Sequence, residues 1–198
     1  MKTLLSIICI FVNCLCFAGP VTEPKSIGGW SEPTNGLRGR LLFAEAPKAD
    51  KYGLLIGEVY LELQNVSAGD TMYVYYVASI SPLHCQLRDF DGKSVESGPS
   101  PGSDGRPSPC WLALPYDSTL RFNTRVGPAF APAHPCLFFC VGLEGGAWEI
   151  LLTATNDYFL SGTFTISAPK NETRPRVWEG TLKLPPVRIP VNNSDAKH

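Results

Sequence analysis

Histidine and cysteine side chains gather in one short stretch, His134-Pro135-Cys136-Leu137-Phe138-Phe139-Cys140. A second such pair, His84-Cys85, lies earlier in the chain. Thiolate and imidazole groups are the ligands that zinc and copper take in proteins. A structural zinc site usually draws on two close Cys or His pairs, whereas Cys85 and Cys110 are 25 residues apart. The spacing therefore argues against a metal site, and we expect no cofactor.

Disulfide formation is the chemistry that these cysteines favour. Three of the seven cysteines lie in the first 18 residues, which leaves Cys85, Cys110, Cys136 and Cys140. An even number of cysteines in an exported chain is typical of paired disulfides. On one extended strand Cys136 and Cys140 would be roughly 13 Å apart, so each would pair with Cys85 or Cys110. A tight turn would instead permit Cys136–Cys140 and Cys85–Cys110. We favour the first arrangement slightly, and both stay open.

Nucleophilic and acid–base catalysis find little support in the sequence. No Gly-x-Ser-x-Gly segment marks an activated serine that could work beside His84 or His134. Paired carboxylates would suit glycoside hydrolysis, but Glu58 and Glu62 stand where a solvated strand face ordinarily carries charge. We therefore expect a protein without enzymatic activity.

Aromatic side chains make a better case for binding. Most tyrosine and tryptophan rings are expected in the core of a β-sandwich. Trp111 is different, because it follows Cys110 and the Pro-rich segment 97–109, and we expect it at the surface. Trp111, Tyr116 and His134 form the candidate binding surface, since loops on sandwich folds often carry recognition. The partner would be a protein or a glycan.

Residues 1–18 have the pattern of a secretory signal peptide. Lys2 gives a positive start, the run from Leu4 to Val12 is almost wholly apolar, and Cys16-Phe17-Ala18 ends in a small residue that a signal peptidase reads. The apolar run is too short to span a bilayer, so we expect no membrane insertion after cleavage. The protein is expected to be secreted, or to lie in the periplasm or on the outside of the cell envelope.

Charge and length narrow the partner and the number of domains. Loss of Lys2 with the leader leaves 16 of the 17 basic side chains against 18 acidic ones, so we expect no nucleic acid as partner. The mature chain is long enough for one core. We expect an N-terminal arm at 19–29, a single β-sandwich domain at 30–191 with a loop insertion at 97–109, and a flexible tail at 192–198.

Alternation of polar and apolar residues predicts that the chain is built of strands. The clearest run extends from Gly57 to Val66, where Val59, Leu61 and Leu63 share one face. Eight or nine strands are expected in all, and the double proline Pro185-Pro186 predicts an edge strand or a strand with a break. The other expected strands lie at 37–43, 71–79, 83–90, 118–126, 148–154, 160–166 and 177–189, and the apolar segments 110–115 and 136–141 lie between them.

These strands and the abundance of turn residues predict the fold class. Glycine and proline number 18 each, which favours many turns and few helices. The sequence predicts an all-β fold, an immunoglobulin-like antiparallel β-sandwich with long Pro/Gly-rich loops. A jelly roll or another closed β-barrel is the alternative.

Three segments carry a resemblance to a known group of proteins. They are Trp30-Ser31-Glu32-Pro33-Thr34-Asn35-Gly36-Leu37, Leu61-Glu62-Leu63-Gln64-Asn65-Val66-Ser67 and Trp178-Glu179-Gly180-Thr181-Leu182-Lys183-Leu184-Pro185-Pro186-Val187. In these three segments and in their order along the chain, the protein resembles a group of exported bacterial proteins that are common in planctomycete-type genomes. Those proteins have an immunoglobulin-like domain of uncharacterised function. The resemblance implies an immunoglobulin-like fold and an extracytoplasmic location, and it brings no catalytic residue with it.

The expected function is a non-enzymatic secreted module with a binding or structural role at the cell envelope or outside the cell. A protein-binding, inhibitor-type module and a carbohydrate-binding module are the alternatives. Binding of a glycan predicts exposed, coplanar aromatic rings on one sheet face. Binding of a protein predicts an unpaired edge strand or a protruding loop. An enzyme predicts a pocket that holds His84 or His134 beside a carboxylate.

Overall fold

The computed structural model describes residues 24–45, 54–77, 82–98, 109–124, 134, 136–141, 146–152 and 157–191 of the 198-residue chain. The expected signal peptide, most of the expected loop insertion and the expected tail lie outside these residues. Within the described ranges every regular element is a strand, so the all-β prediction is confirmed. None of the described residues forms a helix of the length and apolar character needed to cross a membrane.

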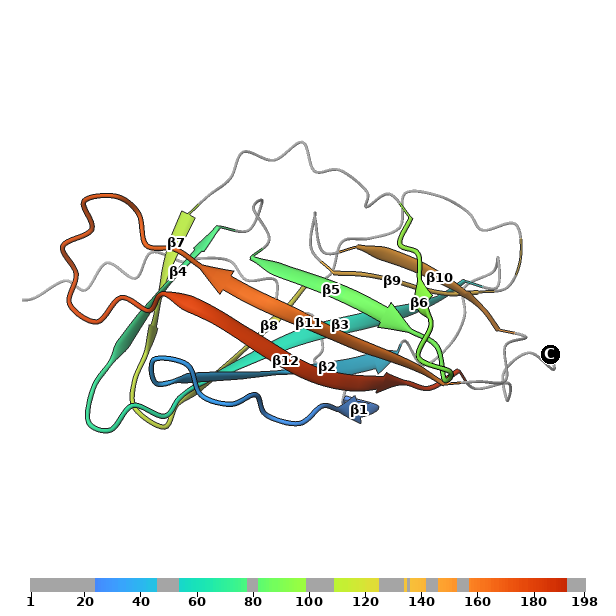
Figure 1. The fold of residues 1–198 in the computed structure, drawn as a ribbon, viewed down its shortest axis with the longest axis horizontal. Helices are drawn as coiled ribbons and strands as arrows, with labels where there is room; N and C mark the ends of the chain where they lie inside the picture. The colour runs from blue at the N-terminus through green and yellow to red at the C-terminus, as the bar shows by residue number, and fades with distance from the viewer. Residues whose placement is uncertain are drawn as a thin grey trace, which may run out of the picture.

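The described strands are numbered in chain order (Figure 1). They are β1 (Ser26–Ile27), β2 (Leu37–Glu45), β3 (Leu54–Asn65), β4 (Met72–Val77), β5 (Leu83–Arg88), β6 (Ser94–Val95), β7 (Pro109–Leu114), β8 (Thr119–Asn123), β9 (Cys136–Cys140), β10 (Ala147–Leu151), β11 (Tyr158–Ile166) and β12 (Gly180–Ile189).

The largest sheet has six strands and is organised around β3. Along one side β3 pairs antiparallel with β2 over the whole of β2, from Leu37 opposite Asn65 to Glu45 opposite Gly57. Along its other side β3 pairs antiparallel with β8 and, nearer its start, parallel with β9. β1 extends the sheet beyond β2, and β10 extends it beyond β9. One long strand therefore joins both halves of this sheet.

The segment before β2 lies along the edge of that sheet. The backbone N–H groups of Lys25, Gly28 and Ser31 donate to carbonyl oxygens of β2 at 2.8–2.9 Å. The described part of the expected N-terminal arm thus continues the ladder that β1 begins. This pairing carries Trp30 alongside β2, where its ring meets side chains of the sheet's outer face.

The second sheet has four strands in the order β12-β11-β5-β6. Its ladder between β11 and β12 shifts register, from Leu160 opposite Val187 to Gly162 opposite Leu184. Pro185-Pro186 therefore faces the single residue Ser161, which is a bulge. Proline cannot donate to a ladder, and β12 lies at the edge of its sheet, so the prediction of a broken edge strand is confirmed.

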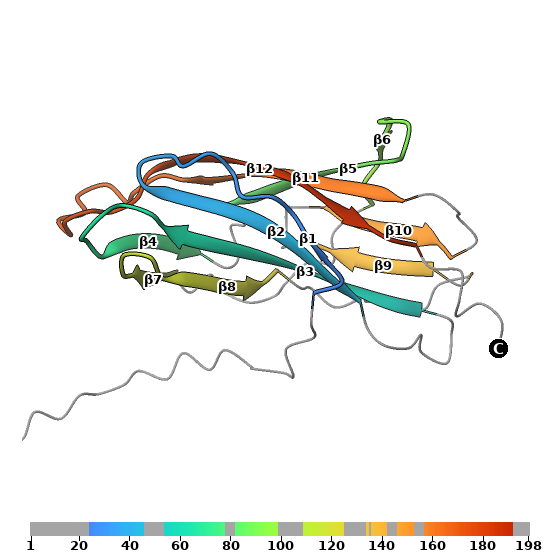
Figure 2. The ribbon, with the colours of Figure 1, turned by 90° about the horizontal axis from the view of Figure 1, so that it is seen from below.

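The main core lies between the two sheets. Figure 2 shows β5, β11 and β12 on one side of the molecule and β3 and β8 on the other. Alternate residues of β2 and β3, such as Phe43 and Leu61, are fully buried in this core, as are Phe164 of β11 and Leu182 of β12. Trp178 stacks on Phe164 with ring centroids 5.9 Å apart. The alternation predicted these inward faces, because successive side chains leave opposite faces of a strand.

The sheets are open and mostly antiparallel. None of the described strands closes a sheet into a barrel, so the alternative of a closed β-barrel is wrong for the described strands. β4 and β7 form a two-stranded ladder of their own at one end of the molecule (Figure 1).

Asn65 joins the turn after β3 to the end of β7. Its side chain is fully buried, and its Nδ2 group donates to the backbone oxygens of Asp70 at 2.8 Å and Leu114 at 2.9 Å. Its Oδ1 accepts a hydrogen bond from the backbone N–H of Ser67 at 2.9 Å. One amide therefore fixes the turn after β3 against the end of β7.

Candidate functional site

The ladder of β4 and β7 presents two different faces. Met72 and Val74 of β4 and Leu114 of β7 are buried in the main core. Because side chains alternate along a strand, Tyr75 and Trp111, which pair in register, lie on the opposite face. Their ring centroids are 4.9 Å apart and their planes are tilted by 49°. The ladder is anchored in the core by one face, and its other face carries Trp111 and Tyr75, of which Tyr75 also packs against the core.

Trp111 is also covered by a cation. The guanidinium carbon of Arg174 lies 4.3 Å from the centroid of the Trp111 ring. A cation–π contact at a partly exposed site stabilises its arrangement by about 0.5–1 kcal/mol. Trp111 is half-buried as a result, whereas Ala113, two residues further along the same face, is exposed. The outer face of the ladder thus has the indole ring of Trp111 held in place beside the exposed residue Ala113.

The backbone of β7 has one edge that β4 does not use. Tyr73 of β4 bonds away from β7, since its N–H donates to Arg176 and its carbonyl accepts from Trp178. In an antiparallel pair the residue opposite Tyr73, which is Ala113, then points its own N–H and C=O away from β4. Trp111, two residues away, does the same. Within the described residues, no hydrogen bond reaches these outward groups.

The chemistry of this edge differs from that of the edge at β12. The residues of β7, Pro109-Cys110-Trp111-Leu112-Ala113-Leu114, carry no charge. β12 has the charged side chains Lys183 and Arg188 as well as its double proline. Charges and prolines protect edge strands against pairing with other chains. On β7 the only such features are two prolines, Pro109 at its start and Pro115 just beyond its end. The residues between them carry nothing that would oppose pairing with another strand.

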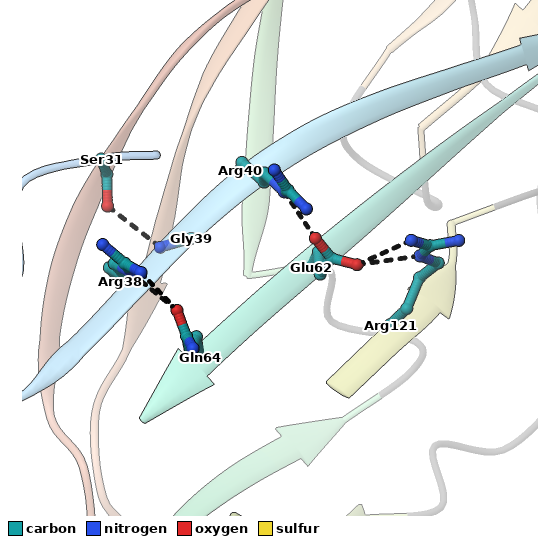
Figure 3. Close-up of polar contacts among 7 residues, drawn as sticks. All are labelled: Ser31, Arg38, Gly39, Arg40, Glu62, Gln64 and Arg121. Atoms are coloured by element: carbon teal, nitrogen blue, oxygen red, sulfur yellow. Dashed lines mark hydrogen bonds and ion pairs between the residues drawn. The ribbon is translucent and has the colours of Figure 1, made fainter. Parts of the chain in front are cut away.

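A buried carboxylate lies on the outer face of β2, β3 and β8. Arg40, Glu62 and Arg121 stand in register across the three strands. Glu62 is 4% exposed, and Figure 3 shows it between the two guanidinium groups. Its Oε2 accepts from Nε of Arg40 at 2.5 Å, and its Oε1 accepts from Nε and Nη2 of Arg121 at 3.0 and 2.8 Å. The prediction of a solvated Glu62 is wrong, because β8 brings Arg121 beside it.

The same face holds further paired groups. The ring of Trp30 packs against Arg40 and Arg38, whose guanidinium carbons lie 4.3 and 4.7 Å from its centroid. Nε and Nη2 of Arg38 donate to the side-chain oxygen of Gln64 at 2.8 and 2.6 Å, as Figure 3 shows. Each guanidinium of this face therefore has a partner on the same face. The arrangement links side chains of three neighbouring strands.

The three segments that carry the resemblance meet at one end of the molecule. The N–H of Val66 donates to the carbonyl of Gly36 at 2.8 Å. The indole N–H of Trp178 donates to the carbonyl of Thr34, also at 2.8 Å. Segments far apart in the sequence are thus joined by direct hydrogen bonds, and the side chain of Trp178 is buried where they meet.

A cavity of about 290 Å³ opens beside this junction. Asp70 and Arg176 line it and form an ion pair of 2.5 Å. The backbone of Arg176 has a φ of 58°, a left-handed conformation that is uncommon for a residue with a side chain. Neither this cavity nor a second one, beside Cys85, is lined by His84 or His134. Neither of these two cavities therefore has the arrangement expected of an enzyme, which is a histidine beside a carboxylate.

The candidate binding residues chosen from the sequence lie apart. Trp111 is part of β7, Tyr116 is 53% exposed in the turn between β7 and β8, and His134 is exposed before β9. No hydrogen bond or ring contact described here joins any two of them. His84 points to solvent from β5. Of these residues, Trp111 alone contacts other side chains in a cluster, which it forms with Tyr75 and Arg174. The sequence did not indicate this cluster.

The four cysteines of the described residues lie on three strands. Cys136 and Cys140 are the two ends of β9 and share a small buried cluster with Phe138, on the face of β9 that points away from the main core. Cys85 packs against the main core from β5, and Cys110 is half-buried on β7. The described residues contain no disulfide. Because β9 is extended, its two cysteines are roughly 13 Å apart and cannot bond each other in this fold. Disulfide pairing otherwise stays a prediction.

Cys85 is a protonated thiol in a confined site. Burial raises its pKa from 9.0 to about 12. Gly162 lies opposite on β11, and a methyl group there would come within 3.0 Å of the Cys85 sulfur. The thiolate is the reactive form of cysteine, so the fold suppresses the reactivity of this group.

In the reduced, folded protein we expect Cys85 to react with iodoacetamide at pH 8 about a thousandfold more slowly than in the unfolded chain. Because its folded pKa is raised, Cys85 should contribute stability that is complete below pH 9 and is lost as the pH rises from 9 towards 12. Peptide mapping by mass spectrometry measures the alkylation rate. Equal rates in the folded and unfolded protein would contradict this account, and a Cys85 disulfide would block alkylation in both until reductant is added.

Comparison of the chain with protein families, with curated proteins and with solved structures finds no match in any of the three. No three His, Cys, Asp or Glu side chains of the described residues gather closely enough to hold a metal ion. The strongest recognition feature of the described residues is therefore the outer edge of β7 with its ring cluster of Tyr75, Trp111 and Arg174.

Proposed function

We propose that this chain is a non-enzymatic, exported binding module with an immunoglobulin-like β-sandwich fold, which recognises an extended segment of polypeptide. The segment would add as a strand to the outer edge of β7. The observation that carries this proposal is that Trp111 and Ala113 direct their backbone N–H and C=O groups away from β4, on an uncharged strand. Strand addition uses such groups for affinity and neighbouring side chains for specificity.

The side chains around this edge support binding of a protein. Tryptophan, tyrosine and arginine are the residues that most often dominate protein–protein contacts. Here Trp111 is already held by Tyr75 and Arg174, so little side-chain freedom would be lost when a partner binds. A large ordered ring next to the exposed Ala113 gives the added strand both an anchor and room.

A glycan-binding role has weaker support. Sugars stack on exposed, coplanar rings, whereas the rings of Tyr75 and Trp111 are tilted by 49° and Arg174 covers part of Trp111. An exported location for the module rests on the leader-like residues 1–18 and on the resemblance of three segments to exported proteins.

A displayed library of random peptides, screened on the immobilised mature protein, tests the proposal. We expect enrichment of peptides with alternating apolar residues, whose binding falls at least tenfold in the variant Trp111→Ala. Tyr116→Ala is the matched control, because Tyr116 is an exposed ring outside the ladder, and this variant should bind as the natural protein does. Peptide affinity that is unchanged in the variant Trp111→Ala would contradict the proposal. Specific binding of a sugar on a glycan array, without any peptide binding, would also contradict it.

A further inference from the structure

We infer that the strand that fits the outer edge of β7 is β7 of a second copy of this chain, in a symmetric antiparallel dimer. The inference rests on the proposed function, since it names the partner of the same edge. It follows from three properties of β7: which backbone groups point outward, where its prolines stand, and which side chains would face each other.

Only a few registers can join two such edges. In an antiparallel pair, hydrogen bonds form between residues that both point their backbone groups at the partner strand. On β7 these residues are Trp111 and Ala113. Trp111 can therefore face Trp111 of the second copy, Ala113 can face Ala113, or Trp111 can face Ala113.

The prolines decide among the three registers. With Trp111 opposite Trp111, each Ala113 faces Pro109 of the other copy, and with Ala113 opposite Ala113, each Trp111 faces Pro115. Proline has no N–H, so both of these registers leave a carbonyl without a donor. With Trp111 opposite Ala113, the N–H and the C=O of both residues are paired, and only the carbonyls of Pro109 and Pro115, at the two ends of the ladder, have no donor. The edge of β7 is thus complementary to itself in one register.

The side chains agree with that register. Trp111 and Ala113 lie on the same, outer face of the ladder, so the dimer places the largest side chain of each strand beside a methyl group of the other. The symmetry axis passes through Leu112, which packs against the core, away from this face. No charge on β7 opposes the contact. Cross-strand pairs of a large and a small residue fill space without a clash.

The dimer is closed. Each copy uses its outward edge on the other, and Pro109 and Pro115 prevent the ladder from growing beyond Trp111 and Ala113. The contact is short by the standard of stable interfaces, so we expect monomer and dimer to exchange in a concentration-dependent way.

Sedimentation equilibrium combined with amide hydrogen exchange of the mature protein tests the inference without any substitution. From low micromolar to near-millimolar concentration, the mass should rise from one copy to two and no further. Over the same range the amides of Trp111 and Ala113 should become protected, whereas the amide of Leu112, bonded to β4, should be protected throughout. A protein that stays monomeric, or a dimer that leaves Trp111 and Ala113 unprotected, would overturn the inference.

The variant Ala113→Pro adds a second test. It removes two of the four hydrogen bonds between the copies, and we expect the dissociation constant to rise about 30-fold. Ala113→Ser keeps the N–H and is the matched control, with an unchanged constant. Circular dichroism confirms that each variant is folded. An unchanged constant for a folded Ala113→Pro variant would overturn the inference.

The outcomes separate this inference from the proposed function. If the protein stays monomeric but enriched peptides protect the amides of Trp111 and Ala113, the proposed function stands and the dimer is wrong. If neither a second copy nor any peptide protects them, both are wrong.

Discussion

Replacing both arginines that flank Glu62, in the variant Arg40→Met/Arg121→Met, is expected to lower the free energy of unfolding by about 3–5 kcal/mol. The carboxylate of Glu62 is 4% exposed and receives all of its described hydrogen bonds from these two side chains. Methionine preserves much of the apolar stem of each arginine. The variant therefore isolates the effect of leaving one buried charge without a partner.

Urea denaturation of a short series measures this effect. Each single replacement, Arg40→Met or Arg121→Met, should cost less than half of the loss seen in the double variant, since one guanidinium remains. Adding Glu62→Leu to the double variant should recover most of the stability, because buried ion clusters can be replaced by apolar residues. Arg188→Met is the control: Arg188 is 60% exposed in its pair with Asp157, and its loss should change stability by less than about 1 kcal/mol. A triple variant no more stable than the double variant would contradict the account.

The change Asn65→Asp, which replaces one amide by a carboxylate of the same shape, is expected to destabilise the protein by about 3–5 kcal/mol. The Nδ2 group of Asn65 donates to the carbonyls of Asp70 and Leu114. Aspartate would place an oxygen, with its charge, against both carbonyls in a site with no exposure. The hydrogen bond from Ser67 alone would remain.

Thermal unfolding followed by circular dichroism measures this loss. The matched control is Asn171→Asp: Asn171 is exposed, and its φ of 70° is a conformation that aspartate also tolerates. That variant should lie within about 0.5 kcal/mol of the natural protein. Equal melting temperatures for both aspartate variants would show that Asn65 does not hold the turn after β3 against the end of β7.

Local alternation was enough to predict the inward faces of the main strands. Val59, Leu61 and Leu63 are buried as their period of two indicated, and the double proline of β12 lies at a break in the ladder, as expected. These features depend on residues next to each other in the chain. The alternation of polar and apolar residues in a strand indicates which of its faces is apolar. The hydrophobic effect then favours burial of that face.

The environment of a residue on the outer face depends on strands that are distant in sequence. Glu62 is buried because β8 contributes Arg121, which is 59 residues away. Nothing near Glu62 in the sequence indicates that pairing. The β1 ladder was missed for a similar reason: Ser26-Ile27 is too short to show a period, and its pairing with β2 alone makes it a strand.

The candidate site was predicted only in part. The position of Trp111 beside a Pro-rich segment drew attention to β7, and the half-burial of Trp111 by Tyr75 and Arg174 depends on contacts made in the folded chain. The outward direction of its backbone groups follows from the partner of Tyr73, which only the fold supplies. Two prolines around an uncharged run were the signal that could have identified the edge from sequence.

The double pairing of β3 has a consequence for how quickly the protein reaches this structure. β2 and β3 are neighbours in the chain and can pair early, but the parallel pairing of Leu54 with Cys136 must join residues that are 82 positions apart in the sequence. Loop closure of that size costs entropy before any contact offsets it, and folds rich in such pairings form in milliseconds to seconds. The start of β3 should therefore be the last part of that strand to acquire protection during refolding, after the half that pairs with β8.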